Sequence, residues 1–358
     1  MRLLFALCLL CLSAQAETLK TDLTSLEVET LAERLEHPWA LAFLPGGELL
    51  ISERPGRLRR LSGGKLGPPI RGLPEISAVG QGGLLDLLFH DGWLYFSYAE
   101  PGKLGNSTAV ARARLQGDRL VQRQLIFRQQ PKVASSLHFG SRLAMAPSGH
   151  LFITLGERFH QMDDAQSLDN HHGKIVRLWP DGRIPKDNPF VGREGALAGI
   201  WSYGHRNSQG AAIHPDTGEL WIHEHGPQGG DELNRPQPGR NYGWPVITYG
   251  EQYGGGKIGI GTHKAGMEQP LYQWTPSIAP SGMVFYRGDA IPAWQGDLLL
   301  GSLKFGLITR LRLDGTQVLA EERIALGARV RDLRQGPDGA LYVLTDQRNG
   351  RLLRLTAK

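Results

Sequence analysis

The stretch WALAFLPGGELLISERPGRLRRL, residues 39–61, contains the pattern that decides the fold of this chain. A short apolar run at 39–44 is followed by a Pro-Gly-Gly turn, and a second apolar run follows at 49–51. Pro55 and Gly56 then mark another turn before an alternating segment. Glycine and proline in such short connections favour tight turns, so the stretch predicts antiparallel strands joined by hairpins.

The same pattern of apolar strand, turn and strongly apolar strand recurs along the chain. The later copies begin at Leu84 (LLDLLFHDGWLYFSYAE), Ser141 (SRLAMAPSGHLFITLGE), Gly210 (GAAIHPDTGELWIHEHG), Ala290 (AIPAWQGDLLLGSLKFGLITRLRLDG) and Val330 (VRDLRQGPDGALYVLTDQRNGRLLRL). One small sheet cannot bury both of its faces alone, so the copies must stack on one another. Radial stacking, which leaves only short sheet edges, predicts an all-β, six-bladed β-propeller forming a single domain over residues 17–358. A β-sandwich or a pair of barrels is the alternative.

The first residues, MRLLFALCLLCLSAQAET, have one Arg, an apolar run and Ala-Gln-Ala at 14–16. This pattern predicts a secretory signal peptide over residues 1–16 and a periplasmic or secreted protein. The apolar run is too short for a stable membrane anchor. A lipid anchor on Cys8 or Cys11 is the alternative, although each follows a leucine rather than a small residue.

Charge and composition exclude other partners. The chain has 40 basic and 35 acidic residues, a formal net charge of +5, without a long Lys/Arg run. We therefore expect no nucleic-acid binding. No segment after the signal peptide is apolar enough to span a membrane. Both cysteines lie within the predicted signal peptide, so the mature chain is expected to contain no disulfide.

Polar clusters lie just before or after the repeated strands, beginning with YGHRNSQG at 203–210, which runs directly into the fourth copy. In a propeller the loops at one end of the axis gather into a funnel, so these clusters should meet. The other clusters are VGQGG from Val79, SLHFGSRL from Ser136, HEHGPQGGDE from His223, SLKFG from Ser302 and ARVRD from Ala328. Together they supply Gln81, His138, Arg206, Asn207, Gln209, Lys304, Arg329 and Arg331. A funnel with four fixed cations suits an anion with several carboxylates or phosphates.

His138 is the preferred candidate for a general base, because an imidazole titrates near neutral pH. Glu157, at the end of the following strand, could orient the ring. His205 is the rival base, and a structural role is the alternative for either histidine.

The segment HEHGPQGGDELN is rich in oxygen donors, with Glu224, Asp231 and Glu232 around the Gly226–Pro227 turn. Hard oxygen donors on an irregular loop suit calcium, whereas a solvated acidic turn is the alternative.

These stretches resemble the soluble quinoprotein sugar dehydrogenases, most of all the aldose sugar dehydrogenase branch. The resemblance starts near His37 and rests on HPWALAFLPGGELLISER, GQGGLLDLLFH, GKIVRLWPDGRIPKDNPF, GHRNSQG, HEHGPQGGDELN, NYGWP, SLKFGLITRLRLD and RVRDLRQGPDGALYVLTD. It implies a six-bladed propeller that binds pyrroloquinoline quinone (PQQ) and calcium. It also implies an aldose substrate and an electron acceptor that the sequence does not identify, in a monomer or homodimer.

The resemblance also implies roles for single residues. His138 would take the proton of the sugar C1 hydroxyl, with Glu157 as its partner, while Arg206 would stabilise charge on the quinone C5 oxygen as hydride reaches C5. Calcium would polarise that oxygen. The residues implied to hold the quinone are Gln81, Arg206, Asn207, Lys304, Phe305, Gly306, Arg329 and Arg331. The carbonyls of Gly226 and Pro227 would ligate this calcium, and Glu232 with the Tyr242 backbone a second one.

Three departures from the family pattern concern the sugar. Leu137 precedes the base where the larger glucose dehydrogenases have Asp, and Glu157 stands where they have Asp. Trp274, beside Tyr272, is one position away from the family's sugar-stacking Trp. Two other functions remain open: a non-catalytic propeller that binds a carbohydrate or protein, and a calcium-dependent lactonase propeller.

Overall fold

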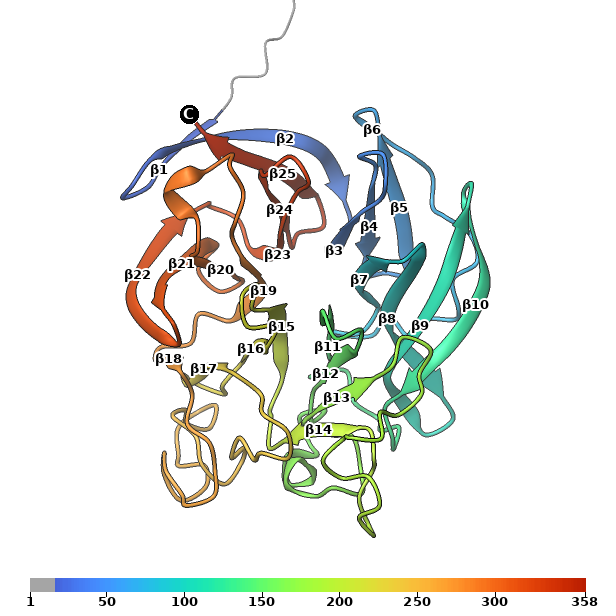
Figure 1. Ribbon diagram of the computed structural model, residues 1–358, viewed down its shortest axis with the longest axis vertical. Coiled ribbons are helices and arrows are strands. Elements are labelled where there is room, and N and C mark those ends of the chain that lie inside the picture. Colours follow the sequence, from blue (N-terminus) through green and yellow to red (C-terminus); the bar gives the residue numbers. More distant parts are fainter. Residues whose placement is uncertain (1–16) are drawn as a thin grey trace, which may run out of the picture.

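The computed structural model describes residues 17–358 as six antiparallel sheets arranged around a central axis (Figure 1). The predicted all-β, six-bladed propeller is confirmed, and the sandwich and the pair of barrels are wrong. The predicted signal peptide, residues 1–16, lies outside the described residues. No helix within 17–358 has the length and apolar character needed to cross a bilayer.

Each of the first three blades is a four-stranded meander whose strands follow one another in sequence order. Blade 1 contains β3 (Pro38–Phe43), β4 (Leu49–Glu53), β5 (Arg57–Ser62) and β6 (Lys65–Leu66). Blade 2 contains β7 (Leu84–His90), β8 (Trp93–Gly102), β9 (Gly105–Gln116) and β10 (Arg119–Arg128). Blade 3 contains β11 (Gly140–Met145), β12 (Leu151–Leu155), β13 (Lys174–Leu178) and β14 (Ile200–Tyr203), with the 3₁₀ helix η1 (Met162–Gln166) between β12 and β13.

The remaining blades continue around the ring. Blade 4 contains β15 (Ser208–Ile213), β16 (Leu220–Glu224), β17 (Asp231–Asn234) and β18 (Tyr272–Trp274). Blade 5 contains β19 (Pro280–Phe285), β20 (Leu298–Ser302), β21 (Leu307–Asp314) and β22 (Gln317–Ala325), with η2 (Pro292–Trp294) between β19 and β20. Blade 6 combines β23 (Val330–Gln335), β24 (Leu341–Thr345) and β25 (Gly350–Ala357) with β2 (Ser25–Leu35) and β1 (Glu17–Lys20).

Blade 6 closes the ring, because it joins the N-terminal strands to the C-terminal ones. β2 pairs antiparallel with β25, with Leu26 opposite Ala357 and Val28 opposite Leu355. In Figure 1 β2 runs alongside β25 next to the C-terminus. The pairing covers an otherwise open sheet edge, which is a general requirement of β-proteins.

The fifth copy of the repeat differs from its prediction. Its first apolar segment, from Ala290, was expected to be a strand, but residues 292–294 form η2. The inner strand of blade 5 is β19, which lies earlier in the sequence. Pro292 explains the difference, because proline lacks a backbone N–H and suits the first turn of a helix.

The core lies between neighbouring blades, where the second strand of all sheets but that of blade 2 is buried along its whole length. β4, β12, β16, β20 and β24 are buried at every position. Large side chains fill the gaps between the sheets, for example Trp221 and Trp274 between blades 4 and 5. This packing fixes the strand ends from which the functional loops project.

Candidate active site

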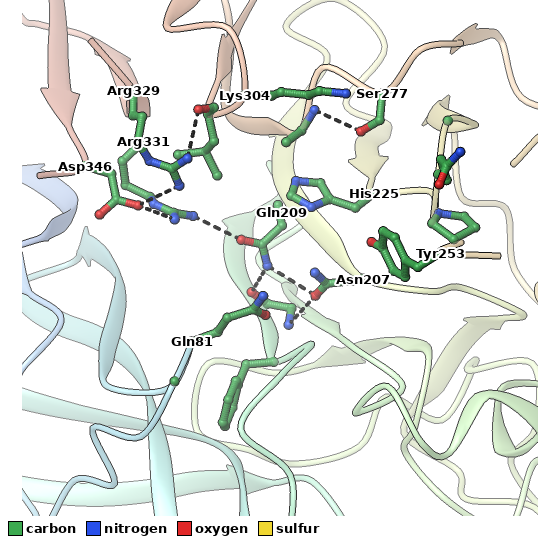
Figure 2. A pocket seen from close by; sticks show the side chains of 18 of the residues that line it. Gln81, Asn207, Gln209, His225, Tyr253, Ser277, Lys304, Arg329, Arg331 and Asp346 are labelled. Carbon is green, nitrogen blue, oxygen red and sulfur yellow. Dashed lines mark hydrogen bonds and ion pairs between the residues drawn. The ribbon is translucent and has the colours of Figure 1, made fainter. Parts of the chain in front are cut away.

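The polar loops meet because of strand direction. In each antiparallel sheet the start of the inner strand lies opposite the end of the second strand, as in the pairs Ser208–Glu224, Pro280–Ser302 and Val330–Thr345. Loops that enter the inner strands and loops that leave the second strands therefore reach the same end of the axis. There they surround a cavity of about 1150 Å³ (Figure 2).

The cavity brings together part of the predicted set. The predicted residues that line it are Gln81, Asn207, Gln209, Pro227, Lys304, Arg329 and Arg331. The predicted residues that do not line it are His138, Glu157, Arg206, Gly226, Glu232, Tyr242, Phe305 and Gly306. Several of these lie directly behind the wall, next to residues that do line it.

One wall of the cavity is cationic and tightly organised (Figure 2). Arg331 donates one hydrogen bond of 2.7 Å to Asp346 and another of 3.2 Å to the Gln209 amide oxygen. Arg329 donates to the Leu303 carbonyl at 3.0 Å. Burial alone would raise the pKa of Asp346, but the charge and hydrogen bond of Arg331, supported by Arg329, hold it well below its ordinary value. Asp346 therefore stays ionised and holds Arg331 in place.

Lys304 differs from these arginines because its charge is unpaired. Within residues 17–358 its ammonium has no hydrogen-bonding or ion-pair partner, and its nearest aromatic contact is the Phe305 ring, 5.2 Å away. Phe305 itself is exposed and does not line the cavity, and Gly306, with φ +64°, turns the chain back toward blade 5. Arg54 lines the cavity as a fourth fixed cation, against two carboxylates, Glu251 and Asp346. The cavity thus has a surplus of positive charge for an anionic ligand.

His138 and Glu157 form a buried pair beside the cavity. The His138 Nδ1 lies 3.0 Å from a carboxylate oxygen of Glu157, and its backbone N–H donates to the Gln81 side chain at 2.9 Å. Gly156 permits this approach, since a Cβ there would lie 2.1 Å from the His138 carbonyl oxygen. His138 itself has φ +50°. The sequence-predicted partners therefore meet through a strained backbone and a required glycine.

The charge states of this pair leave one imidazole nitrogen free. Burial lowers the pKa of His138, the Glu157 hydrogen bond raises it, and the charge of Arg206 lowers it further, with a net decrease. A carboxylate oxygen of Glu157 faces Nδ1, and a neutral ring that donates a hydrogen bond to it carries its proton on Nδ1. Nε2 then keeps its lone pair, and no side chain or backbone group of residues 17–358 hydrogen-bonds to it.

His205, the rival base, has both ring nitrogens engaged. Its Nδ1 lies 2.9 Å from Glu224 and its Nε2 lies 2.9 Å from the Ser202 hydroxyl. The ring is fully buried and stacks on Tyr242 with ring centroids 4.7 Å apart. No nitrogen of His205 is available to a substrate in the cavity.

Arg206 lies between the cavity wall and the Gly226–Pro227 turn. Its guanidinium donates to the carbonyl oxygens of His225 at 3.1 Å and Gly226 at 2.9 Å. It also lies 5.2 Å from the centroid of the Trp244 ring, and its buried Nε has no hydrogen-bond partner in the described part of the chain.

Asp231 braces the turn that carries Gly226 and Pro227. Its carboxylate accepts hydrogen bonds from the backbone N–H groups of Gly226, Ile278 and Ala279 and from the Ser277 hydroxyl. These bonds join the turn after β16 to the segment that enters β19. Within residues 17–358 no group donates a hydrogen bond to the Pro227 carbonyl oxygen, so this oxygen is free to bind a ligand.

Two carboxylates lie side by side behind this turn. Glu224 and Glu232 are directly opposite each other on β16 and β17. Both accept from the Asn234 amide, whose own oxygen is buried without a donor in the described structure. Burial and then the charge of Glu224 raise the pKa of Glu232 to about 8. Across residues 17–358 no three His, Cys, Asp or Glu side chains converge, so a cation here would also need amide or carbonyl oxygens.

Comparison with known proteins identifies the family. The family model described as glucose/sorbosone dehydrogenase matches residues 35–354. The chain belongs to this family. It is 45% identical to aldose sugar dehydrogenase YliI of Escherichia coli strain K12, over 99% of this chain and 98% of that protein. The predicted membership of the soluble quinoprotein sugar dehydrogenases, and the prediction of an oxidoreductase, are confirmed.

Solved structures of relatives have the same architecture. The crystal structure of the soluble aldose sugar dehydrogenase from Escherichia coli in its apo-form has a TM-score of 0.90 at 46% identity, covering 93% of this chain and 100% of that chain. The PQQ-bound form of aldose sugar dehydrogenase from Streptomyces coelicolor has a TM-score of 0.74 at 29% identity, covering 93% and 98%.

Several lining residues of this family member were missed by the sequence analysis. Arg54 directly follows β4, and Asp346 directly follows β24. Lys304 lies in the corresponding loop, two residues after the end of β20. The position after the second strand of each repeat could have identified them. Tyr253 lines the cavity from the long segment between β17 and β18, for which the repeat gave no signal.

The aromatic residues that the sequence placed near the sugar lie elsewhere. Trp274 is 2% exposed and packs in the core between blades 4 and 5. The Tyr272 hydroxyl donates to Glu321 at 2.8 Å on the outer side of the sheet. Thr275, Pro276 and Ser277 line the cavity instead.

Proposed function

We propose that this protein oxidises the C1 hydroxyl of an aldose to the lactone, with PQQ as cofactor and calcium at the Gly226–Pro227 turn. The observation that carries the proposal is a cation-rich cavity adjoining a neutral, carboxylate-oriented histidine. The E. coli relative is named an aldose sugar dehydrogenase, and the Streptomyces structure is of a PQQ-bound form.

The cavity residues fit an anionic quinone. Lys304, Arg329 and Arg331 would hold its carboxylates, and Lys304 has no competing partner in residues 17–358. Gln81 and Asn207 add amide groups that can hydrogen-bond to carbonyl oxygens. When bound, PQQ supplies a two-electron acceptor for the sugar.

His138 is suited to accept the proton of the sugar hydroxyl. Its depressed pKa keeps the ring neutral at neutral pH, and Glu157 fixes the tautomer that leaves Nε2 as the acceptor. Glu157 also stabilises the imidazolium that proton transfer produces. Arg206 offers positive charge close by, and its buried Nε lacks a protein partner in the described residues. We assign it to electrostatic stabilisation of the electron acceptor.

Calcium fits the turn only if the ligand shares in its coordination. The carbonyl oxygens of Gly226 and Pro227 are hard donors, and the Gly226 oxygen has a second lone pair besides the one used by Arg206. Two carbonyls fall short of the six to eight oxygens that calcium takes, so the cofactor and water would supply the rest. A second calcium would fit between the carboxylates of Glu224 and Glu232 and the Asn234 side-chain oxygen, which accepts no hydrogen bond in the described residues. The Tyr242 carbonyl would be a further ligand.

One assay tests this proposal. The purified protein is loaded with PQQ and calcium, and reduction of an artificial electron acceptor is followed with a panel of aldoses. We expect turnover that requires both PQQ and sugar. Absence of turnover with every aldose would favour a non-catalytic propeller, and lactone hydrolysis without PQQ would favour a lactonase.

We also propose that the protein works in the periplasm or outside the cell, after cleavage behind Ala16. The support is the Ala-Gln-Ala sequence that ends the apolar run. N-terminal sequencing of the exported protein tests this, and a mature chain that starts at Met1 would contradict it.

A further inference from the structure

A short hairpin stands at the rim of the cavity, within the segment between β17 and β18. Glu251 and Lys257 form its antiparallel bridge, and Gln252 exchanges backbone hydrogen bonds of 2.9 Å with Gly255 and Gly256. Tyr253 lies at its tip, and both Glu251 and Tyr253 line the cavity.

The hairpin is attached to the turn that we assign to calcium. Gln228, next to Pro227, exchanges two backbone hydrogen bonds with Glu251, of 3.0 and 3.1 Å. The position of Tyr253 relative to the Gly226–Pro227 turn is therefore set by backbone pairing. In Figure 2 Tyr253 lies on the opposite side of the view from Arg329, Arg331 and Asp346.

Tyr253 differs from the other aromatic residues that line the cavity. Trp39 is covered by the guanidinium of Arg142, at 4.1 Å, and Phe139 by that of Arg158, at 3.8 Å. Tyr249 is half-buried and its hydroxyl donates to a side chain. Tyr253 is 63% exposed, and no aromatic or cationic partner contacts its ring in the described residues. It is an aromatic face at the cavity without a protein partner.

We propose that Tyr253 is the stacking platform for the sugar ring, so that the 251–257 hairpin forms the sugar subsite. An aromatic face binds the apolar C–H face of a pyranose, while the adjacent Glu251 carboxylate can accept hydrogen bonds from sugar hydroxyls. This subsite lies away from the cationic wall assigned to the quinone. The inference rests on the proposed function, because it names where the sugar of that reaction binds.

The test uses a pyranose that cannot be oxidised at C1. The probe is 1,5-anhydroglucitol, which has no anomeric hydroxyl, and its binding to the PQQ- and calcium-loaded protein is measured by saturation-transfer NMR. Tyr253→Ala should weaken probe binding and raise the KM for aldose by about three- to tenfold, the usual range for an aromatic contact. Tyr253→Phe should retain both values, and PQQ affinity should be unchanged in each variant.

Ile260→Ala is the matched control, since Ile260 is 59% exposed on the same long segment but does not line the cavity. Unchanged probe binding in Tyr253→Ala would overturn the subsite, as would an equal loss in Ile260→Ala or a loss of PQQ affinity. Failure of the active wild type to bind the probe would also overturn it. A protein that binds the probe through Tyr253 yet oxidises no aldose would overturn the proposed function and keep the subsite.

Discussion

At residue scale, two histidines each contact a glutamate side chain, but hydrogen bonding to the second ring nitrogen gives them different roles. His138 and His205 each place Nδ1 about 3 Å from a carboxylate. Only His205 has its second nitrogen occupied, by the Ser202 hydroxyl. The free Nε2 of His138, beside the cavity, is what makes it the proposed base.

His138→Ala should therefore slow quinone reduction by about 10²- to 10⁴-fold, the usual effect of losing a general base. PQQ should remain bound, because the cationic wall does not depend on the imidazole. Rapid-mixing kinetics measure the rate and titration measures the binding. Normal reduction in His138→Ala together with slow reduction in a His205 variant would reverse the assignment.

The acid limb of the activity profile should lie below pH 6.5, the ordinary value for histidine, because the pKa of His138 is lowered mainly by burial. The same shift has a consequence for stability. Below pH 6.5 the unfolded chain binds a proton that the folded His138 does not, so this residue destabilises the fold increasingly as pH falls. Kinetics and unfolding from pH 5 to 8 measure both effects. An acid limb centred above pH 6.5 would contradict the assignment.

Lys304→Gln should weaken PQQ binding by about tenfold, because it removes one charge-assisted contact. Thermal stability should not change, since the ammonium has no partner in residues 17–358. Titration of the quinone measures the affinity. Lys103→Gln, at an exposed hairpin position outside the cavity, removes the same charge and should leave PQQ affinity unchanged.

At the scale of elements, β2 determines whether the ring is closed. Its first side chains alternate, so that Leu26 is fully buried in the core between blades 5 and 6 while Glu27 is exposed. Asp231 has a comparable role between blades 4 and 5, because it bonds the turn after β16 to the entry of β19. Such contacts hold the loops at fixed positions around the cavity.

Leu26→Ala should lower the free energy of unfolding by about 2 to 5 kcal/mol, the range for removing a large buried side chain. Glu27→Ala, one position along the same strand, should change it by less than about 0.5 kcal/mol. Urea denaturation measures both. Equal effects of the two substitutions would show that the closing strand is not packed as described.

At the scale of the whole molecule, the cavity is a product of all six blades. Its wall draws Arg54 from the loop after β4, Gln81 from the loop before β7, and Asn207, Lys304 and Asp346 from later blades. Any ligand that binds these residues together is bound only by the folded ring. Its binding therefore stabilises the fold by mass action.

Removing calcium with a chelator should abolish activity and lower the melting temperature together. A cation between Glu224 and Glu232 would offset the repulsion that, with burial, raises the pKa of Glu232 to about 8. Scanning calorimetry and the dehydrogenase assay measure the two effects. Calcium should restore both, whereas magnesium, which prefers fewer ligands in a smaller octahedral site, should not. Full activity in metal-free buffer would contradict calcium dependence.

The sequence alone determined the six-bladed fold, although it misplaced the inner strand of blade 5, because a strand–turn–strand repeat is a local pattern read from neighbouring residues. Its polar clusters also placed Lys304, Arg329 and Arg331 in one funnel, and its motifs identified the family. Only the tertiary structure decided the rest. It buried Trp274, engaged both nitrogens of His205, and brought Arg54, Asp346 and Tyr253 into the same cavity. These outcomes depend on how the blades close into a ring and on which strand ends meet at the same end of the axis. They are set by contacts between residues up to hundreds of positions apart in the sequence, which no local pattern reveals.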